Sequence, residues 1–489
     1  MAASATSILF SWRRVDALPD LERLGWALSC LPDGEIIEAL EGLRGNGRNH
    51  YPVSALWRAL VAGVVFQHPS IASLVRELGR NPALLEICGF DPLPRQGRPR
   101  RWVDEDGMAR IVHEPLRHLV PGEWVFSRMM VNLVRLEEER GLVSAMVDNL
   151  RDSLMEALPD YGEHLGADGK AIESHGTGRV DRKSGETSDR DADWGFHKTL
   201  GEDRNGKRWE KIKRWFGYGL HVIADTKYEL PVSFRLTPAS GSEQPVLCAM
   251  VKELFAEVPE LAERCGEFSA DRGYDQEGLK EDLWEDYAIR PLIDTRLLWR
   301  EEKKDPDHDP SKPILRLLDR NRADNILHSE RGEVLCRCPS SGEIRPMAHQ
   351  GFEADRNTLK YRCPAAAYDL DCKGREACLA RSGSKAGSYG RIVRIKLDDA
   401  NRRIFTPTPW GSPSWKRGYN RRSAVERINA RLDRVYGFEV HFIRGIAKMR
   451  TRVSLAFAVM MAMALASIEA GHGERMRSLV EPVPLADTG

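Results

Sequence analysis

The spacing of hydrophobic residues changes from a helical to a strand-like period near residue 160. Before that point, apolar residues recur every three or four positions, as at Leu56, Leu60 and Val64, and this is the period of an amphipathic helix. Beyond it, short apolar runs alternate with polar residues between turn-forming residues, a pattern typical of strands. The chain therefore predicts an all-α N-terminal domain over residues 1–140 and an α/β region that begins near residue 160.

Turn signals divide the helical domain. His68, Pro69 and Ser70 interrupt the helical spacing, and Ser70 is a candidate N-cap for the helix that follows. Short helices in this order suit either a helix-turn-helix-like module that binds DNA or a purely structural bundle. Both interpretations stay open.

The segment 92–101, with the sequence PLPRQGRPRR, follows these helices. Its prolines exclude a continuous helix. The segment predicts either a basic extended arm that contacts DNA through Arg98, Arg100 and Arg101, or a charged linker.

The α/β region predicts a mixed sheet flanked by helices. The expected elements are a hairpin at 219–223 and 230–236, a helix at 244–258, a strand before Asp271, a helix at 276–287 and a strand at 289–293. The segment 177–214 is polar and rich in charge, so we expect a long loop or flap there.

Two carboxylates of this region have settings that suit an active site. Asp168 precedes Gly169, as at a strand end that opens onto a turn. Asp271 ends the run 267–270 and is soon followed by Gly273. We therefore expect both acids at strand tips of one sheet, where the active sites of α/β folds gather.

A third carboxylate, Glu426, lies in a helical pattern. On an ideal helix of roughly 100° per residue, Tyr419, Arg422 and Glu426 fall within about 80° of one another, so they are expected to share one face. Carboxylates supply the oxygen ligands that hard cations need, and two Mg²⁺ ions stabilise both oxygens of an in-line displacement at a phosphodiester. An arginine can hold a phosphate by a bidentate fork, and a tyrosine can stack on a strand end.

These residues resemble a DDE transposase of a bacterial insertion sequence, with an RNase H-like catalytic domain. The family's third-acid signature is Tyr, two residues, Arg, three residues, Glu, six residues, Lys. Tyr419, Arg422 and Glu426 match it, but Asp433 occupies the lysine position, next to Arg434. The resemblance also covers Asp193-Trp194-Gly195, the run 216–221 with Asp225, Arg444-Gly445 with the apolar tail after it, and residues 51–90, which are similar to the N-terminal domain of such transposases.

The resemblance implies a function and its partners. Asp168, Asp271 and Glu426 would hold two Mg²⁺ or Mn²⁺ ions, while Tyr419, Arg422 and the neighbouring Arg421 would bind the scissile strand. The protein would hydrolyse a DNA strand at each transposon end and join the 3′-hydroxyl to target DNA. Its partners would be double-stranded DNA, as transposon ends and target, and further copies of itself in a homodimer or higher multimer, since two ends must be joined.

Four other polar residues near these motifs have open roles. Asp275 is either a helix N-cap or supporting residue or a metal ligand. His221, Asp193 and Asp225 are either catalytic or structural.

Charge is balanced over the 489 residues, with 73 basic and 73 acidic side chains, so net charge gives no indication of nucleic acid. It is segregated along the chain, because residues 415–452 contain eleven cations against three acids. This composition predicts a basic surface around Glu426, to which a solvated amphipathic helix would contribute.

We expect no signal peptide. The apolar stretch 453–468 is shorter than the roughly 20 residues of a membrane span, so we expect a buried helix in a cytoplasmic, nucleoid-associated bacterial protein without membrane contact.

An insertion is expected between the second and third acids, which are 426 − 271 = 155 residues apart. The catalytic domain would then comprise residues 160–300 and 401–470, with the insertion at 301–400 and a tail at 471–489.

Five of the nine cysteines lie in the insertion. They predict either a structural zinc site of Cys338, Cys363, Cys372 and Cys378, with Cys336 as the spare, or free thiols. Zinc would fasten a segment with few apolar residues of its own. The remaining four, Cys30, Cys88, Cys248 and Cys265, look like buried small hydrophobic residues.

Two other classes of function stay open. An RNase H-like nuclease or resolvase would cut without joining and would use the same metal site. An inactive domesticated DNA-binding protein is favoured by Asp433 in place of lysine, while the intact set of three acids argues against it.

Overall fold

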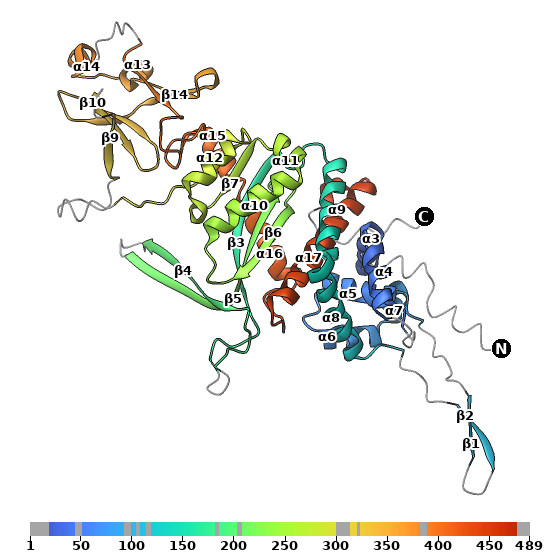
Figure 1. Cartoon of the computed structure of the whole chain (residues 1–489). Helices are drawn as coiled ribbons and strands as arrows, with labels where there is room; N and C mark the ends of the chain where they lie inside the picture. The colour runs from blue at the N-terminus through green and yellow to red at the C-terminus, as the bar shows by residue number, and fades with distance from the viewer. Residues whose placement is uncertain are drawn as a thin grey trace.

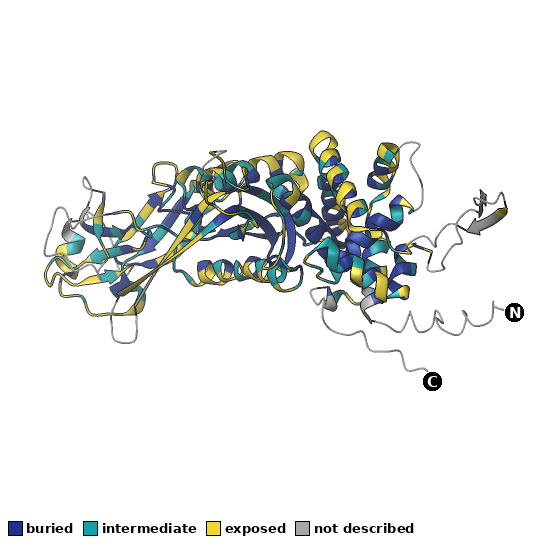
Figure 2. Cartoon of the chain, turned by 90° about the horizontal axis from the view of Figure 1, so that it is seen from below, coloured by how far each residue is buried: buried dark blue, intermediate teal, exposed yellow. Residues whose placement is uncertain are grey.

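The computed structural model describes residues 19–44, 51–91, 99–103, 108–113, 119–180, 185–202, 208–299, 313–319, 323–381 and 389–476. The Cys-containing insertion lies at one end of an elongated molecule, a twisted sheet lies in the centre, and the N-terminal helices lie at the other end (Figure 1). Buried residues gather along the central sheet and among the N-terminal helices (Figure 2).

The N-terminal region is helical as expected. Its helices are α3 (Pro19–Cys30), α4 (Gly34–Arg44), α5 (Val53–Val65), α6 (Ile71–Arg80), α7 (Pro82–Cys88), α8 (Glu123–Arg140) and α9 (Leu142–Ala157). The expected N-cap at Ser70 is confirmed, because its side chain accepts a hydrogen bond from the backbone N–H of Ser73 at 3.2 Å. Such a cap satisfies one of the amides that a helix start leaves without a partner.

Part of the expected basic arm is a β-hairpin. Strand β1 (Pro99–Val103) pairs with β2 (Ala109–His113) in antiparallel register. Arg100 and Arg101 belong to β1, whereas Arg98 lies outside the described residues. An extended backbone is the conformation that a Pro-containing segment of this kind favours.

Helix α17 (Ile446–Glu469) joins the helical region to the sheet. It packs against α3, α5, α8 and α9 on one side and against a strand of the central sheet, β6 (Leu230–Pro238), on the other. Among the described residues it is the one helix long and apolar enough to cross a membrane, and 89% of its apolar window is buried inside the fold. A helix that is apolar on every side needs such burial, so the prediction of a buried helix is confirmed.

The central sheet is mixed. Its other strands are β3 (His164–Glu173), β4 (Asp193–Glu202), β5 (Arg208–Asp225), β7 (Glu267–Ala270) and β8 (Arg290–Ile293). β6, β5 and β3 are antiparallel neighbours, and β7 and β8 follow β3 in parallel. Three antiparallel strands followed by two parallel ones form the RNase H-like sheet that the resemblance implies.

Helices cover both faces of this sheet. α10 (Glu243–Glu257), α11 (Pro259–Arg264) and α12 (Glu277–Glu285) follow the hairpin and β7, while α15 (Pro413–Asn420) and α16 (Ser423–Arg434) follow the insertion. α10 contacts β5 and β6, and α16 contacts β3 and β5. The two helices cover opposite faces, since alternate residues of β3 meet one or the other: Gly166 meets α16, and Gly169 meets α10.

The segment 177–214, expected to be a long loop or flap, contains strands from Asp193 onward. β4 pairs with the first half of β5 from Asp193↔Gly217 to Glu202↔Arg208, and together they form a ribbon that projects from the sheet (Figure 1). Aromatic and β-branched residues stand among the charges of both strands, and residues of these types stabilise strands in spite of the polar composition.

The insertion contains two small antiparallel sheets. β9 (Leu315–Asp319), β10 (Ala323–Ser329), β11 (Val334–Arg337) and β12 (Ile344–Pro346) form the first, and β13 (Ala348–Glu353), β14 (Thr358–Arg362) and β15 (Ile392–Lys396) form the second, with α13 (Pro364–Tyr368) and α14 (Arg375–Arg381) beside them. The expectation that this segment has few apolar residues is wrong. It has a core separate from that of the rest of the chain, made of Ile326, Val334, Met347, Leu359, Tyr361, Ile395, Leu397, Ile404 and Phe405.

Candidate active site

Asp168 and Asp271 are neighbours because β3 and β7 run parallel. Ala167 lies opposite Ala270 in the register of these strands, so the next residues, Asp168 and Asp271, stand on adjacent strands about 4.8 Å apart. β7 ends at Ala270, and Asp271 is the N-cap of the 3₁₀ turn η1 (Arg272–Tyr274). The strand-tip prediction is therefore confirmed for Asp271.

Asp168 lies within its strand and not at its end, which corrects the sequence-based expectation. β3 continues to Glu173, and Gly169 does not form a turn. A Cβ at Gly169 would lie 3.0 Å from Tyr274 Oη and 3.4 Å from Glu243 Oε1. The glycine therefore permits a close approach of side chains beneath the site, a second reason for glycine in a strand.

Glu426 reaches the two aspartates because α16 lies close against β3. A Cβ at Gly166 would stand 3.0 Å from Val425 Cγ2 and 2.8 Å from Thr226 Cγ2, so a larger residue would displace Thr226 and press on this helix. The helix is not the continuous one that the pattern predicts, because α15 ends at Asn420 and α16 begins at Ser423.

Arg422 connects the acids across this break. Its guanidinium lies 3.6 Å from Asp168 Oδ1 and 2.8 Å from Glu426 Oε1. It also lies over the ring of Tyr419, 5.5 Å from the centroid, and Tyr419 stacks on Trp415 at a centroid distance of 4.5 Å. The structure thus brings together Tyr419, Arg422 and Glu426 as expected.

Burial sets the electrostatics of the site. It raises the pKa of Asp168 to about 6, an effect that Arg422 opposes and that Glu426 and Asp271 strengthen. Burial also raises the pKa of Tyr419 to about 12. Three carboxylates around one guanidinium leave excess negative charge at this place, and a divalent cation would compensate that charge.

Two residues that were not predicted from the sequence lie near the acids. Asn429 donates a hydrogen bond from Nδ2 to Asp168 Oδ2 at 3.2 Å. Its position three residues after Glu426 places it on the same helix face, and that spacing was the available signal. Glu243, in the first turn of α10, has its pKa raised by burial and by the nearby Asp271; no local pattern indicates its closeness to Asp271.

Asp433, which occupies the position of the signature's lysine, forms an ion pair with a lysine of the sheet. Asp433 pairs with Lys170, with 2.5 Å between Nζ and Oδ2, and the two side chains are 25% and 11% exposed. Lys170 follows Asp168 by two residues in β3, so both side chains lie on the face that α16 covers. In this ion pair the strand therefore supplies the cation, and the helix supplies the acid at the position of the signature's lysine.

Asp433→Lys is expected to destabilise the protein by about 1–3 kcal/mol, because it places two cations together in a half-buried site. Adding Lys170→Asp should recover most of that loss. Chemical unfolding of the wild type, both single variants and the double variant measures the coupling. Additive losses in the double variant would show that the two residues act independently.

The remaining candidates have structural contacts. Asp225 accepts backbone N–H groups of Gly162 and Lys227, both at 2.9 Å. His221 is buried, with a ring nitrogen 3.3 Å from Tyr274 Oη, and burial lowers its pKa to about 4. Asp193 is exposed at the base of the ribbon, where it accepts the N–H of Trp194 at 2.7 Å.

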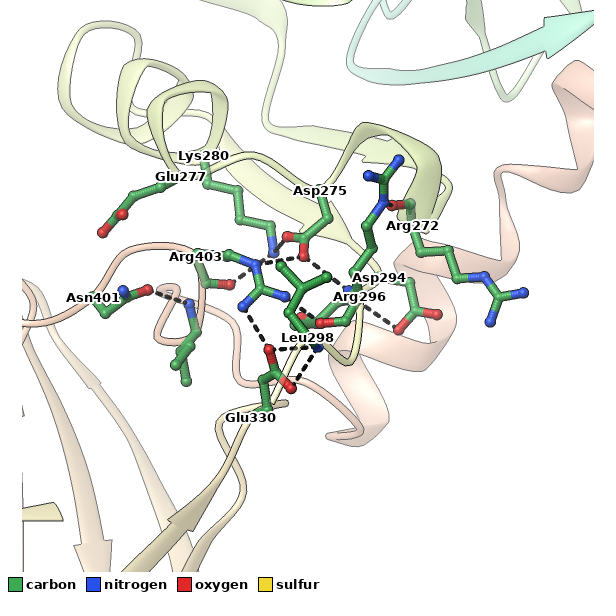
Figure 3. Close-up of polar contacts among 12 residues, drawn as sticks. Arg272, Asp275, Glu277, Lys280, Asp294, Arg296, Leu298, Glu330, Asn401 and Arg403 are labelled. Carbon is green, nitrogen blue, oxygen red and sulfur yellow. Dashed lines mark hydrogen bonds and ion pairs between the residues drawn. The ribbon is translucent and has the colours of Figure 1, made fainter. Parts of the chain in front are cut away.

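Asp275 also has a structural role, in a buried polar network (Figure 3). It accepts hydrogen bonds from Lys280 Nζ at 2.7 Å, Arg403 Nε at 2.8 Å and the backbone N–H of Arg296 at 2.8 Å. Arg403 binds Glu330 as well, at 2.9 Å. The network ties the start and end of the insertion to the turn that follows Asp271.

Arg421 points to the sheet edge, where its Nη1 lies 3.0 Å from Glu267 Oε2. Its side chain is 43% exposed, so about half of it is accessible to solvent.

Within the described ranges, no group of three or more His, Cys, Asp or Glu side chains is arranged closely enough to hold a metal ion as it stands.

The donor set nevertheless suits a hard cation. Asp168, Asp271 and Glu426 offer carboxylate oxygens, and among the described residues Asn429 Oδ1 and Arg422 Nε are buried without a hydrogen-bond partner. Buried polar atoms in this condition are rare and call for a missing partner. Oxygen donors of this kind fit Mg²⁺ or Mn²⁺.

One family of known proteins matches the part of the chain that forms this site. No curated protein matches the chain. A solved piggyBac transposase synaptic complex with hairpin DNA is 12% identical and has a TM-score of 0.37, with coverage of 96% of this chain and 80% of that one; a likeness of this size supports no further argument. The family model described as "Transposase DDE domain" matches residues 167–462, which is more than half of the chain and contains all three acids. The protein therefore belongs to the transposase DDE domain family.

Proposed function

We propose that this protein cleaves DNA at the ends of a transposon and joins the released 3′-hydroxyl to target DNA. The observation that carries the proposal is the convergence of Asp168, Asp271 and Glu426 from three separate segments around Arg422. Bound Mg²⁺ or Mn²⁺ ions, two per site, would supply charge stabilisation and an activated water or hydroxyl.

The chain's own residues would prepare this site. Asp168, Asp271 and Glu426 would hold the cations, and Asn429 would fix the orientation of Asp168 through its 3.2 Å hydrogen bond. Bound cations would compensate the negative charge of the carboxylates and so release Arg422. Its guanidinium could then bind a phosphate oxygen through its N–H donors. Tyr419 beneath it would hold the strand end.

DNA and further copies of the chain are the proposed partners. Residues 1–140, the β1–β2 hairpin with Arg100 and Arg101, and the neighbouring Arg98 would contact the transposon end, and Arg421 would contact the scissile strand. A homodimer or larger multimer would hold two ends together, in the cytoplasm at the nucleoid. The domain boundaries of 160–300, 301–400 and 401–470 belong to this proposal.

A strand-transfer assay tests the joining step. Purified protein, Mg²⁺ and a labelled duplex that ends in the 3′-hydroxyl of its own transposon end are incubated with a supercoiled plasmid. The label should appear in the plasmid. If intact ends are nicked while pre-cut ends never join, the protein is a nuclease or resolvase; binding without either reaction would indicate the inactive DNA-binding alternative.

We also propose a structural zinc ion in the insertion. Cys336, Cys338, Cys363, Cys372 and Cys378 line one cavity of about 290 Å³. Hydrogen bonds with the side chain of Ser341 and with the backbone N–H groups of Ser341 and Ser340 lower the pKa of the Cys338 thiol to about 6; the Ser341 N–H lies 3.4 Å from Sγ. A thiolate is the form that binds zinc. The thiols would have to reorient to complete the site, since no three of these described side chains are placed to hold a metal ion as they stand.

Purified protein is expected to contain about one zinc per chain, because four thiolates form a closed tetrahedral site. Elemental analysis after gel filtration in EDTA-free buffer measures this content. Cys338→Ser should lose the metal and lower the melting temperature, whereas Cys248→Ser, at a half-buried position outside the insertion, should retain it. A metal-free wild type with five titratable thiols in the insertion would favour free thiols.

A further inference from the structure

The β4–β5 ribbon carries a set of large apolar side chains that are about half exposed or more, although one of them, Trp194, also packs on Phe216. In antiparallel pairs, directly opposed residues point to the same face. Trp194, Phe196 and Ile212 therefore share one face, and their side chains are 54%, 74% and 47% exposed. The other face carries Trp209, which is 44% exposed. Large apolar side chains left in water at this density mark an interaction surface.

Cations stand beside each of these apolar side chains. Arg214 is the cross-strand neighbour of Phe196, and Lys198 is that of Ile212. Lys211 and Lys213 lie on the same face as Trp209. All four cations are exposed. Lys198 is paired with Glu210 at 2.6 Å, and the exposed Asp193 lies on the face with Trp209, so each face keeps one more cation than acids among these side chains.

We propose that this ribbon grips duplex DNA beside the active site, an inference that rests on the proposed function. The interleaving of aromatic and basic residues favours DNA over a second protein chain, because protein interfaces exclude charged residues from their cores. Nucleic-acid surfaces combine cations for phosphates with aromatic side chains that stack on or wedge between bases. A two-stranded ribbon is also narrow enough for the major groove.

The fold fixes where along the DNA the ribbon would bind. Its root is the pairing of Gly217 with both Asp193 of β4 and Glu173 of β3, and Glu173 is five strand positions beyond Asp168. At about 3.3 Å per strand residue, the root lies about 17 Å from Asp168, and the ten residues of β4 extend about 33 Å further. With about 3.4 Å per base pair, the ribbon would cover DNA about 5 to 15 base pairs from the scissile phosphate.

Trp215 and Gly195 make the ribbon rigid at its base. The indole of Trp215 donates to the backbone oxygen of Tyr218 at 3.1 Å. A Cβ at Gly195 would lie 2.5 Å from Trp215 Cζ2, so the glycine lets the indole lie flat across the strand pair. A rigid root allows the exposed residues further out to meet DNA without a large loss of conformational entropy.

The test compares full-length variants in DNA binding and cleavage. Lys211→Glu with Lys213→Glu should weaken binding to a 30-base-pair duplex at least about 10-fold at moderate salt and reduce the slope of log affinity against log salt by roughly 2. Phe196→Ala with Ile212→Ala should weaken it about 5- to 50-fold. Lys211→Arg with Lys213→Arg is the matched control and should bind like the wild type.

Shortened substrates separate this inference from the proposed function. A transposon-end duplex that stops about 4 base pairs from the cleavage point should be cut equally by the wild type and the ribbon variants. If only binding to the end is weakened, the ribbon holds the transposon; if only joining to a plasmid is weakened, it holds the target. Unchanged affinity for both DNAs would overturn the inference, and a loss of the multimer in light scattering with unchanged DNA affinity would assign the ribbon to a contact between copies.

Discussion

Asp168→Asn is expected to abolish strand cleavage while it stabilises the metal-free protein at neutral pH. The catalytic loss should be on the order of 10³-fold or more, since a group that stabilises the transition state is removed. The gain in stability follows from burial: the side chain is 18% exposed, and its pKa is raised from 3.8 to about 6 in the folded state. Ionising a buried carboxyl group costs free energy in the folded state, and asparagine, which has no charge, avoids this cost.

The sign of the pH dependence follows from linkage. A folded-state pKa above the unfolded one means that Asp168 contributes stability below about pH 3.8 and loses it as pH rises through about 6. Above that range, the ionised group destabilises the fold by about 3 kcal/mol at most, from a shift of about two pH units. Asp168→Asn should therefore exceed the wild type in free energy of unfolding at pH 7.5, and the difference should shrink by about 1 kcal/mol at pH 5.

Urea unfolding in EDTA at both pH values measures this effect. Asp355→Asn, at a side chain that is 74% exposed, is the matched control and should change stability by less than about 0.5 kcal/mol. A variant of Asp168 that is less stable than the wild type at pH 7.5 would contradict the electrostatic description of the site.

Asp275→Ala should destabilise the protein by about 3–5 kcal/mol, because it leaves Lys280 charged and buried without its partner. The two side chains are 0% and 1% exposed. Arg403 loses its 2.8 Å contact as well, so the insertion is expected to loosen from the catalytic domain. Thermal unfolding followed by circular dichroism measures the loss.

The same variant decides between the two roles of Asp275. If the residue is structural, the folded fraction of Asp275→Ala at low temperature should cleave DNA at close to the wild-type rate, and Asp275→Asn should be intermediate in stability. A variant of normal stability that fails to cleave would make Asp275 a metal ligand.

Local patterns in the sequence predict the parts of the site that depend on neighbouring residues. The strand end at Asp271, the N-cap at Ser70 and the pairing of Arg422 with Glu426 each follow from spacing within one turn or one strand. Such features are set by backbone periodicity, which a single sequence displays.

The features that the sequence did not predict depend on contacts between distant segments. Lys170 pairs with Asp433 across 263 positions, and Asp275 meets Arg403 across 128. The place of Asp168 inside β3 is set by pairing with β5, which makes Gly169 a point of close packing in place of a turn. The sequence did not predict the β4–β5 ribbon, because its exposed strands have the polar composition that is typical of loops elsewhere.

The most direct test of the central claim is single-turnover cleavage, in Mg²⁺, of a labelled duplex that carries the ends flanking the protein's own gene. Wild type is compared with Glu426→Gln and with Glu439→Gln, the same change at an exposed acid of the same segment. We predict nicked product from the wild type and Glu439→Gln, and none from Glu426→Gln in spite of unchanged DNA binding. Equal cleavage by all three proteins would contradict the assignment of Glu426, and with it the three-acid site.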